Sequence, residues 1–244
     1  MADASEWWKP CIAEFVGVFT LVYIGAGSIV ATGGNNLVAI ALAHGLAIAV
    51  MATALMHISG GHFNPAVTIA ALFTKRIPWE LGLLYVIFQL LGGIFGAFLL
   101  VASFPGNQWE PVHLGTPAVT GITAANAVIV EAVMTFFLVF VIFGVAIDGR
   151  NLMKGVAGFA IGLTVTMDIL MGGPITGAAL NPARAFGPAL LSRTWEGQLI
   201  YWAGPLLGGI MAGLVYENAF LQPTRKEEAP RETAMPTTPP PPST

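Results

Sequence analysis

The apolar positions along this chain come in long runs rather than in the short alternations typical of soluble proteins. Six such runs contain very few charged residues: about 8–31, 37–58, 79–102, 124–147, 155–173 and 198–220. A helix of about 20 apolar residues crosses the hydrocarbon core of a bilayer. The pattern therefore predicts an all-α membrane protein with six transmembrane helices.

The composition agrees with this prediction. Hydrophobic residues make up 55% of the chain and charged residues 9%, and the mean hydropathy is +0.75, whereas about 25% of a soluble domain is charged. Glu14 lies inside the first run and five more runs follow, so we do not expect a cleaved signal peptide. The single cysteine, Cys11, excludes an internal disulfide.

The basic residues predict the orientation in the membrane. They lie before the first run, between the second and third, between the fourth and fifth, and after the sixth: Lys9, Lys75, Arg76, Arg150, Lys154, Arg225, Lys226 and Arg231. The loops on the other side contain only Arg184 and Arg193. Because basic loops stay in the cytoplasm, both termini are predicted to be cytoplasmic. Residues 222–244 are rich in proline and poor in apolar residues, which predicts a disordered cytoplasmic tail after one domain over 1–221.

One tripeptide occurs twice, as Asn64-Pro65-Ala66 and Asn181-Pro182-Ala183, 117 residues apart. Asparagine is a strong N-cap, and proline suits the first position of a helix. Each tripeptide starts a segment of about 11 residues, or roughly 16 Å of helix, which is too short to span a bilayer. The sequence therefore predicts two re-entrant half-helices whose positive ends meet inside the membrane.

The same offset relates other residues, so the chain contains an internal repeat. Glu14 corresponds to Glu131 and Ser59-Gly60 to Thr176-Gly177. The halves cover about 8–106 and 124–220. Each half has three spans, so the two halves enter the membrane from opposite sides, which places the functional site near the midplane.

Non-helical backbone at membrane depth is tolerated where it is buried in protein or lines a watery cavity. The segments just before the two tripeptides are of this kind, and they offer carbonyl groups to a polar path. The predicted carbonyl-bearing residues are Gly60, Gly61, His62, Gly177 and Ala179. A row of acceptors that ends at two asparagine amides describes a single-file hydrogen-bonding path.

Three segments carry a resemblance to a known family: AEF (13–15), ISGGHFNPAVT (58–68) and ITGAALNPARAFGPA (175–189). They resemble the aquaporin (major intrinsic protein) family, and the resemblance covers about residues 8–220. It implies a right-handed bundle of six helices with two re-entrant half-helices, one pore per chain, and a homotetramer in the lipid bilayer.

The resemblance also implies a four-residue constriction, a selectivity filter, on the extracellular side. Its residues are His44, Ile169, Ala178 and Arg184. This set resembles plant tonoplast intrinsic proteins more than orthodox water channels, which have Phe and His at the first two places. Glycerol facilitators instead pair two aromatic residues with arginine. A fixed guanidinium at a narrow mouth repels cations and donates hydrogen bonds to water.

Several other polar residues have alternative interpretations. The resemblance implies that Glu14 and Glu131 accept hydrogen bonds from backbone amides of the re-entrant loops and anchor them. His44 either lines the pore or is satisfied within the bundle. His113 either folds over the filter as a fifth filter residue or is an ordinary loop histidine. Asp168 stands where the tonoplast pattern has Asn, and it either pairs with one of these histidines or faces a neighbouring helix or the extracellular interface.

We therefore predict a passive, bidirectional water channel that excludes protons and ions, with ammonia as a further candidate permeant. Ala185 follows Arg184 where glycerol facilitators carry Asp, and Tyr201-Trp202 resembles the aromatic pair of water channels; both favour water over glycerol. The alternatives are a glycerol or small-polyol facilitator, a secondary transporter, which needs coupling-ion ligands at the midplane, and a structural junction protein. We expect no enzymatic activity, cofactor, metal centre or nucleic-acid partner.

Overall fold

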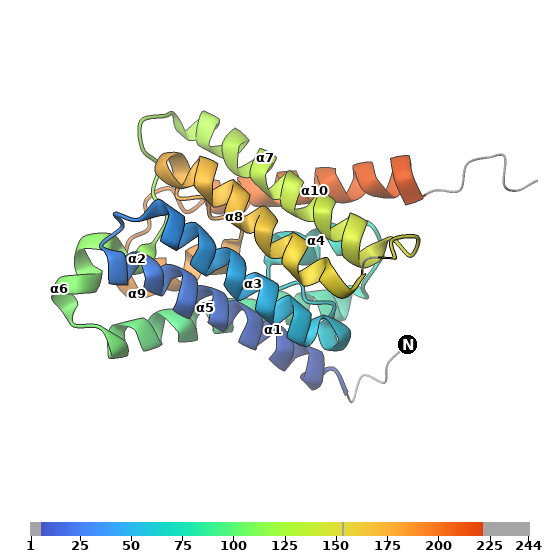
Figure 1. Ribbon diagram of the computed structural model, residues 1–244, viewed down its shortest axis with the longest axis horizontal. Helices are drawn as coiled ribbons and strands as arrows, with labels where there is room; N and C mark the ends of the chain where they lie inside the picture. Colours follow the sequence, from blue (N-terminus) through green and yellow to red (C-terminus); the bar gives the residue numbers. More distant parts are fainter. Residues whose placement is uncertain (1–5, 153, 222–244) are drawn as a thin grey trace, which may run out of the picture.

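The computed structural model describes residues 6–152 and 154–221, and these residues form helices joined by short loops, without strands (Figure 1). The expected tail over 222–244 lies outside the described residues. The α-helices, in chain order, are α1 Trp8–Thr20, α2 Gly27–Thr32, α3 Leu37–Ser59, α4 Pro65–Phe73, α5 Trp79–Ser103, α6 Gly106–Trp109, α7 Ala124–Ile142, α8 Ala157–Thr176, α9 Pro182–Ser192 and α10 Ile200–Tyr216.

Shorter helical turns continue or connect these helices. π-helical turns are Leu21–Ala26 between α1 and α2, Phe143–Ile147 after α7, and Glu217–Leu221 after α10; 3₁₀ turns are Glu110–Gly115 and Lys154–Val156. The sequence pattern did not indicate the π-turns, because one extra residue in a helical turn hardly alters the spacing of a uniformly apolar run.

The described residues contain five helical stretches long and apolar enough to cross a membrane: Trp8–Thr32, Leu37–Ser59, Trp79–Ser103, Ala124–Ile147 and Ala157–Thr176. The sixth predicted span is α10, which has 17 residues and is prolonged by its π-turn to Leu221. The prediction of an all-α membrane protein is confirmed.

Helices pack closely within each half of the repeat and between the two halves. α1 packs on α5, α7 packs on α10, and α3 packs on α8 across the middle. Glycines allow these approaches, because a Cβ at Gly92 would overlap the Phe15 carbonyl, and one at Gly208 would overlap the Ala132 carbonyl. Small residues that bring helix backbones together are the usual packing device in membranes.

The two short helices begin where the repeated tripeptides predicted. The Asn64 side chain accepts a hydrogen bond from the Ala66 amide at 2.8 Å, and the Asn181 side chain accepts one from the Ala183 amide at 3.0 Å. Each helix has proline at its first position. Local capping chemistry therefore explains why both helices begin inside the bundle.

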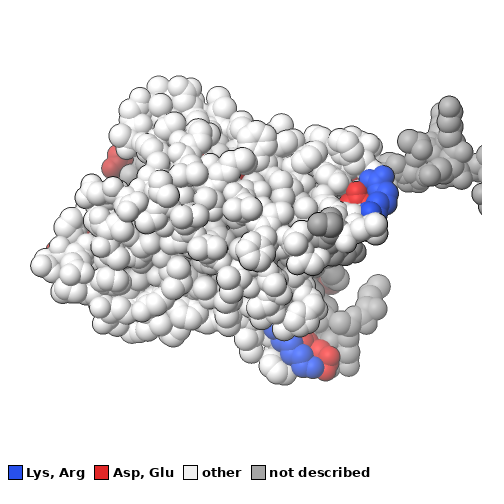
Figure 2. Space-filling view, in the orientation of Figure 1, with Lys and Arg blue, Asp and Glu red and all other residues white. Residues whose placement is uncertain are grey.

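Both ends of the described chain lie at the same end of the bundle, since α1 begins there and the turn Glu217–Leu221 finishes there (Figure 1). Figure 2 shows that the lysine and arginine side chains of the visible face are also gathered at this end. The basic side chains of this face and the chain ends thus lie at the same end of the bundle.

Candidate pore

Three cavities in the bundle share lining residues, and we call them together the passage. A narrow middle cavity of about 30 Å³ is lined by both repeated asparagines and by residues of both re-entrant loops. It shares His44, Ile169 and Arg184 with a cavity of about 260 Å³, which we call the outer cavity. It shares His62, Val67 and Ile142 with a cavity of about 300 Å³, which we call the inner cavity. The passage is therefore wide, narrow and wide again.

At the centre of the passage, each asparagine side chain joins one half of the repeat to the other. Asn64 Nδ2 donates to the Leu180 carbonyl at 2.9 Å, and Asn181 Nδ2 donates to the Phe63 carbonyl at 2.7 Å. The amide oxygens are used as helix caps. Since an amide nitrogen carries two hydrogens, each asparagine keeps one hydrogen beside the passage.

The two re-entrant loops have matching backbone conformations. Left-handed φ angles recur at equivalent positions: Gly60 (88°) and Gly177 (80°), Gly61 (65°) and Ala178 (44°), Phe63 (48°) and Leu180 (53°). Of the residues predicted to bear pore carbonyls, Gly61, His62 and Ala179 line the narrow cavity. Gly60 lines the inner cavity and Gly177 lines the outer one.

Glu14 of α1 is fully buried and receives four hydrogen bonds. The Ser59 hydroxyl donates at 2.6 Å and the His62 amide at 3.0 Å, and the Phe63 amide donates to the second carboxylate oxygen. The fourth donor is Gln89 Nε2 of α5, at 2.8 Å. The carboxylate thus ties the first re-entrant loop to two long helices.

Glu131 of α7 repeats this arrangement with one donor fewer. It accepts from the Thr176 hydroxyl at 2.7 Å, the Ala179 amide at 3.0 Å and the Leu180 amide at 2.8 Å. The repeat aligns Gln89 with Pro205, whose side chain has no hydrogen-bond donor, so the fourth donor is missing. The hydroxyl donors were missed by the sequence analysis, although Ser59 and Thr176 stand at the repeat offset.

The four residues predicted to form the constriction all line the narrow cavity: His44, Ile169, Ala178 and Arg184. His44 Nδ1 lies 2.9 Å from the Ile40 carbonyl, which can only accept, so the ring hydrogen belongs on Nδ1. Nε2 is then the acceptor for Arg184 Nη2 at 3.2 Å. In this arrangement His44 is neutral and holds the arginine.

Arg184 has a second acceptor that the sequence analysis did not identify. Its Nη1 donates to the Gly115 carbonyl at 2.9 Å. Three consecutive residues there are left-handed, with φ angles of 48° at His113, 53° at Leu114 and 70° at Gly115. This unusual turn brings a loop carbonyl to the guanidinium, and no sequence signal beyond the glycine indicates it.

Two of the predicted roles for polar residues do not appear in the structure. The His113 side chain is exposed and lines neither the narrow nor the outer cavity, so the loop contributes Gly115 rather than its histidine. Asp168 is 3% exposed, and its Oδ2 has no hydrogen-bond partner among the described residues. Both ring nitrogens of His44 bind other groups, so the Asp168–His44 pair, one of the alternatives for Asp168, is not formed among the described residues.

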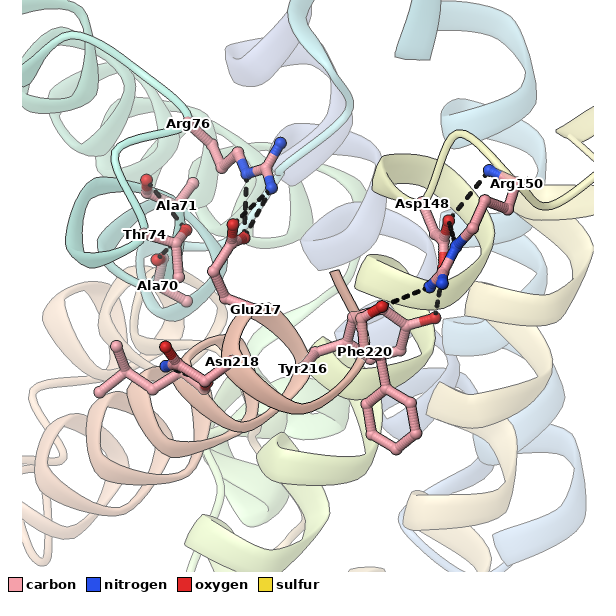
Figure 3. Close-up of polar contacts among 11 residues, drawn as sticks. Ala70, Ala71, Thr74, Arg76, Asp148, Arg150, Tyr216, Glu217, Asn218 and Phe220 are labelled. Atoms are coloured by element: carbon pink, nitrogen blue, oxygen red, sulfur yellow. Dashed lines mark hydrogen bonds and ion pairs between the residues drawn. The ribbon is translucent and has the colours of Figure 1, made fainter. Parts of the chain in front are cut away.

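Two ion pairs lie near the end of α10 (Figure 3). Arg76, which lines that cavity, donates to Glu217 at 2.7 Å. Asp148 accepts from Arg150 at 2.7 Å and from the Tyr216 hydroxyl at 3.1 Å. The neighbouring residues Tyr216 and Glu217 therefore contact two different ion pairs.

The Asp148 contact predicts a pH dependence. Hydrogen bonds from the side chain and then the backbone of Arg150 hold the pKa of Asp148 well below its usual range. The stabilisation is complete above the ordinary pKa of about 4, and it is lost as the pH falls below that value. We expect Asp148→Asn to speed hydrogen exchange of residues 143–151 several-fold at pH 7, and wild type to match it only in strong acid.

Glu217→Gln is the matched control for that measurement, because it weakens the Arg76 pair instead. Its faster exchange should be confined to residues near Arg76. Equal exchange of 143–151 in Asp148→Asn and wild type at pH 7 would contradict the assignment.

Comparison with known proteins supports the architecture. The family model described as Major intrinsic protein matches residues 1–216. Aquaporin TIP4-4 of Zea mays is 42% identical over 234 residues, which is 92% of this chain and 91% of that protein. Aquaporin-4 of Mus musculus is 40% identical over 223 residues, or 88% of this chain and 68% of that protein.

A solved structure gives the same answer for the fold. The X-ray structure of the aquaglyceroporin from Plasmodium falciparum has a TM-score of 0.77 and 23% identity to this chain, covering 87% of this chain and 96% of that one. The re-entrant half-helices, the inverted halves and the match over residues 1–216 agree, and the chain therefore belongs to the major intrinsic protein family.

Proposed function

We propose that the protein is a passive, bidirectional channel that conducts water and excludes protons and ions. The observation that carries this proposal is the narrow cavity of about 30 Å³ between two wider ones. A cavity needs roughly 10–15 Å³ to hold one water, so the narrow section has room for only two or three water molecules. The named aquaporin relatives support water as the permeant.

Water in the narrow section meets hydrogen-bonding groups that replace those it leaves behind. Loop carbonyls accept from it, and the free amide hydrogens of Asn64 and Asn181 donate to it at the centre. Both half-helices direct their positive ends to the same place. A central water that accepts from both asparagines cannot pass a proton along the file, and a cation is repelled.

The filter adds a fixed positive charge. Arg184 is 1% exposed, is held by His44 and Gly115, and lines the narrow cavity. Ile169 and Ala178 supply apolar lining to the same cavity. A fixed positive charge beside apolar lining favours a small neutral molecule over an ion.

The remaining expectations are part of the same proposal. Residues 1–221 form one channel domain that spans the bilayer with both termini cytoplasmic, as the basic residues near the chain ends favour. Glu14 and Glu131 anchor the re-entrant loops. The chain assembles as a homotetramer with one pore per subunit, and it has no enzymatic role.

Stopped-flow light scattering on proteoliposomes tests the function. We expect osmotic shrinkage at least about tenfold faster than in empty liposomes of the same lipid, since a preformed pore removes the cost of dissolving water in hydrocarbon. Glycerol uptake should be little faster than in the empty vesicles, and an ammonia gradient forms the third arm. Shrinkage no faster than in empty liposomes would contradict the proposal, and rapid glycerol uptake would favour a polyol facilitator.

A further inference from the structure

The first membrane span contains a π-turn, Leu21–Ala26, beside the constriction. π-turns are rare and are often found at functional sites. Leu21 lines the narrow cavity. The other end of the turn faces the groups that hold Arg184, which gives the turn a role that the proposed function has not used.

Gly25, within this turn, lies against the imidazole of His44. A Cβ at this position would lie 2.5 Å from Cδ2 of His44 and 2.7 Å from both Cγ and Nε2. Real Cβ atoms do not approach other atoms so closely. Because Gly25 has no side chain, the imidazole can occupy the space where a Cβ would lie, and Nε2 can accept from Arg184.

The His44 ring has little freedom to give way. Its Nδ1 is tied to the Ile40 carbonyl of its own helix, and it is 2% exposed. The open volume beside it is the passage itself, which His44 lines. A methyl group at Gly25 would therefore push the imidazole into the narrow cavity and away from Arg184.

The next residue of the turn supports the second acceptor of Arg184. Ala26 is fully buried, and a Cβ on Gly115 would lie 3.0 Å from both the Cβ and the carbonyl oxygen of Ala26. The backbone of Gly115 thus rests directly on the turn. Two consecutive residues of the π-turn contact the two groups, His44 and Gly115, that position the guanidinium.

We propose that Gly25 is a specificity-determining residue of the channel, which positions His44 and through it Arg184. The inference rests on the proposed filter. The first span shapes the proposed constriction by lacking a side chain at Gly25 rather than by supplying one. The width available to a solute therefore depends on Gly25 as well as on the four filter residues.

The test is osmotic water permeability of Gly25→Ala in proteoliposomes, normalised to the protein in the vesicles. We expect it to fall about tenfold, because the displaced imidazole obstructs a single file and loses its bond to Arg184. Gly27→Ala is the matched control, since the only atom near its new Cβ is the flexible Leu100 Cδ2 at 3.0 Å. That control should conduct water as wild type does.

His44→Ala separates this inference from the filter proposal. The single variant should admit glycerol, and if its glycerol-to-water ratio equals that of wild type, the filter assignment fails. In the His44→Ala background, Gly25→Ala should leave water permeability nearly unchanged. An equal loss with and without His44, or full activity of Gly25→Ala alone, would overturn the role of Gly25.

If Gly25→Ala alone is not inserted stably, the recovery of folded protein from membranes tests the same contact between Gly25 and His44. The clash is then removed in Gly25→Ala/His44→Ala, which should be recovered from membranes as a monodisperse protein. Failure of both variants, with His44→Ala recovered normally, would show that Gly25 acts on the general packing of the span and would overturn the inference.

Discussion

Arg184→Ala is expected to raise proton permeability at least tenfold while water still passes, because it removes the positive charge of the proposed filter. The guanidinium is 1% exposed and lies between His44 and the Gly115 carbonyl. Two like charges about 4 Å apart repel by roughly 4 kcal/mol at an effective dielectric constant of about 20. That energy exceeds the roughly 1.4 kcal/mol that corresponds to a tenfold change in rate.

The measurement uses a pH-sensitive dye trapped in proteoliposomes, with a potassium diffusion potential as the driving force. Arg193→Gln is the matched control, because this arginine is exposed at the end of the same helix, α9. Its proton influx should equal that of wild type. If Arg184→Ala conducts water but takes up protons no faster than wild type, the asparagine pair alone excludes protons.

Glu14→Ala is expected to be the most destabilising substitution of a buried acid in this chain. It removes the acceptor of four hydrogen bonds, whereas Glu131→Ala removes the acceptor of three. A buried donor left without a partner costs about 1–3 kcal/mol. Several such losses together amount to a large part of the typical 5–15 kcal/mol stability of a folded domain.

Thermal unfolding in detergent, followed by size-exclusion chromatography, measures this effect. We expect the order wild type, Glu131→Ala, Glu14→Ala from most to least stable, with Glu14→Gln between the last two. Glu80→Ala is the control, because Glu80 is exposed in the first turn of α5. Unfolding of Glu14→Ala at the temperature of Glu80→Ala would show that the loop does not depend on the carboxylate.

Gln89 illustrates how the two halves of the repeat differ. Its Nε2 also donates to the Thr68 hydroxyl at 2.9 Å, and Thr68 in turn lies 3.1 Å from Nδ1 of His62. The inner half of the passage therefore rests on a polar network that continues from Glu14 to a residue of the narrow cavity. The aligned Pro205 has no side-chain donor, so Glu131 receives no hydrogen bond equivalent to that from Gln89 among the described residues.

Much of this molecule could be predicted from local chemistry in the sequence. The length of the apolar runs determined the spans, since crossing a bilayer requires a minimum length. Asn64-Pro65 and Asn181-Pro182 determined where the half-helices begin, because cap and first-turn preferences act within a few residues. The common offset of these motifs determined the inverted arrangement of the halves.

Tertiary structure alone decided which groups meet at the constriction. Gly25, His44, Gly115 and Arg184 are far apart in the chain, and their contacts depend on how the π-turn Leu21–Ala26, α3, α9 and the loop before Thr116 pack. His113 was the more conspicuous residue in that loop, yet three left-handed residues present the Gly115 carbonyl instead. Backbone direction and the space left by an absent Cβ carry no local sequence pattern, so only the packed structure reveals them.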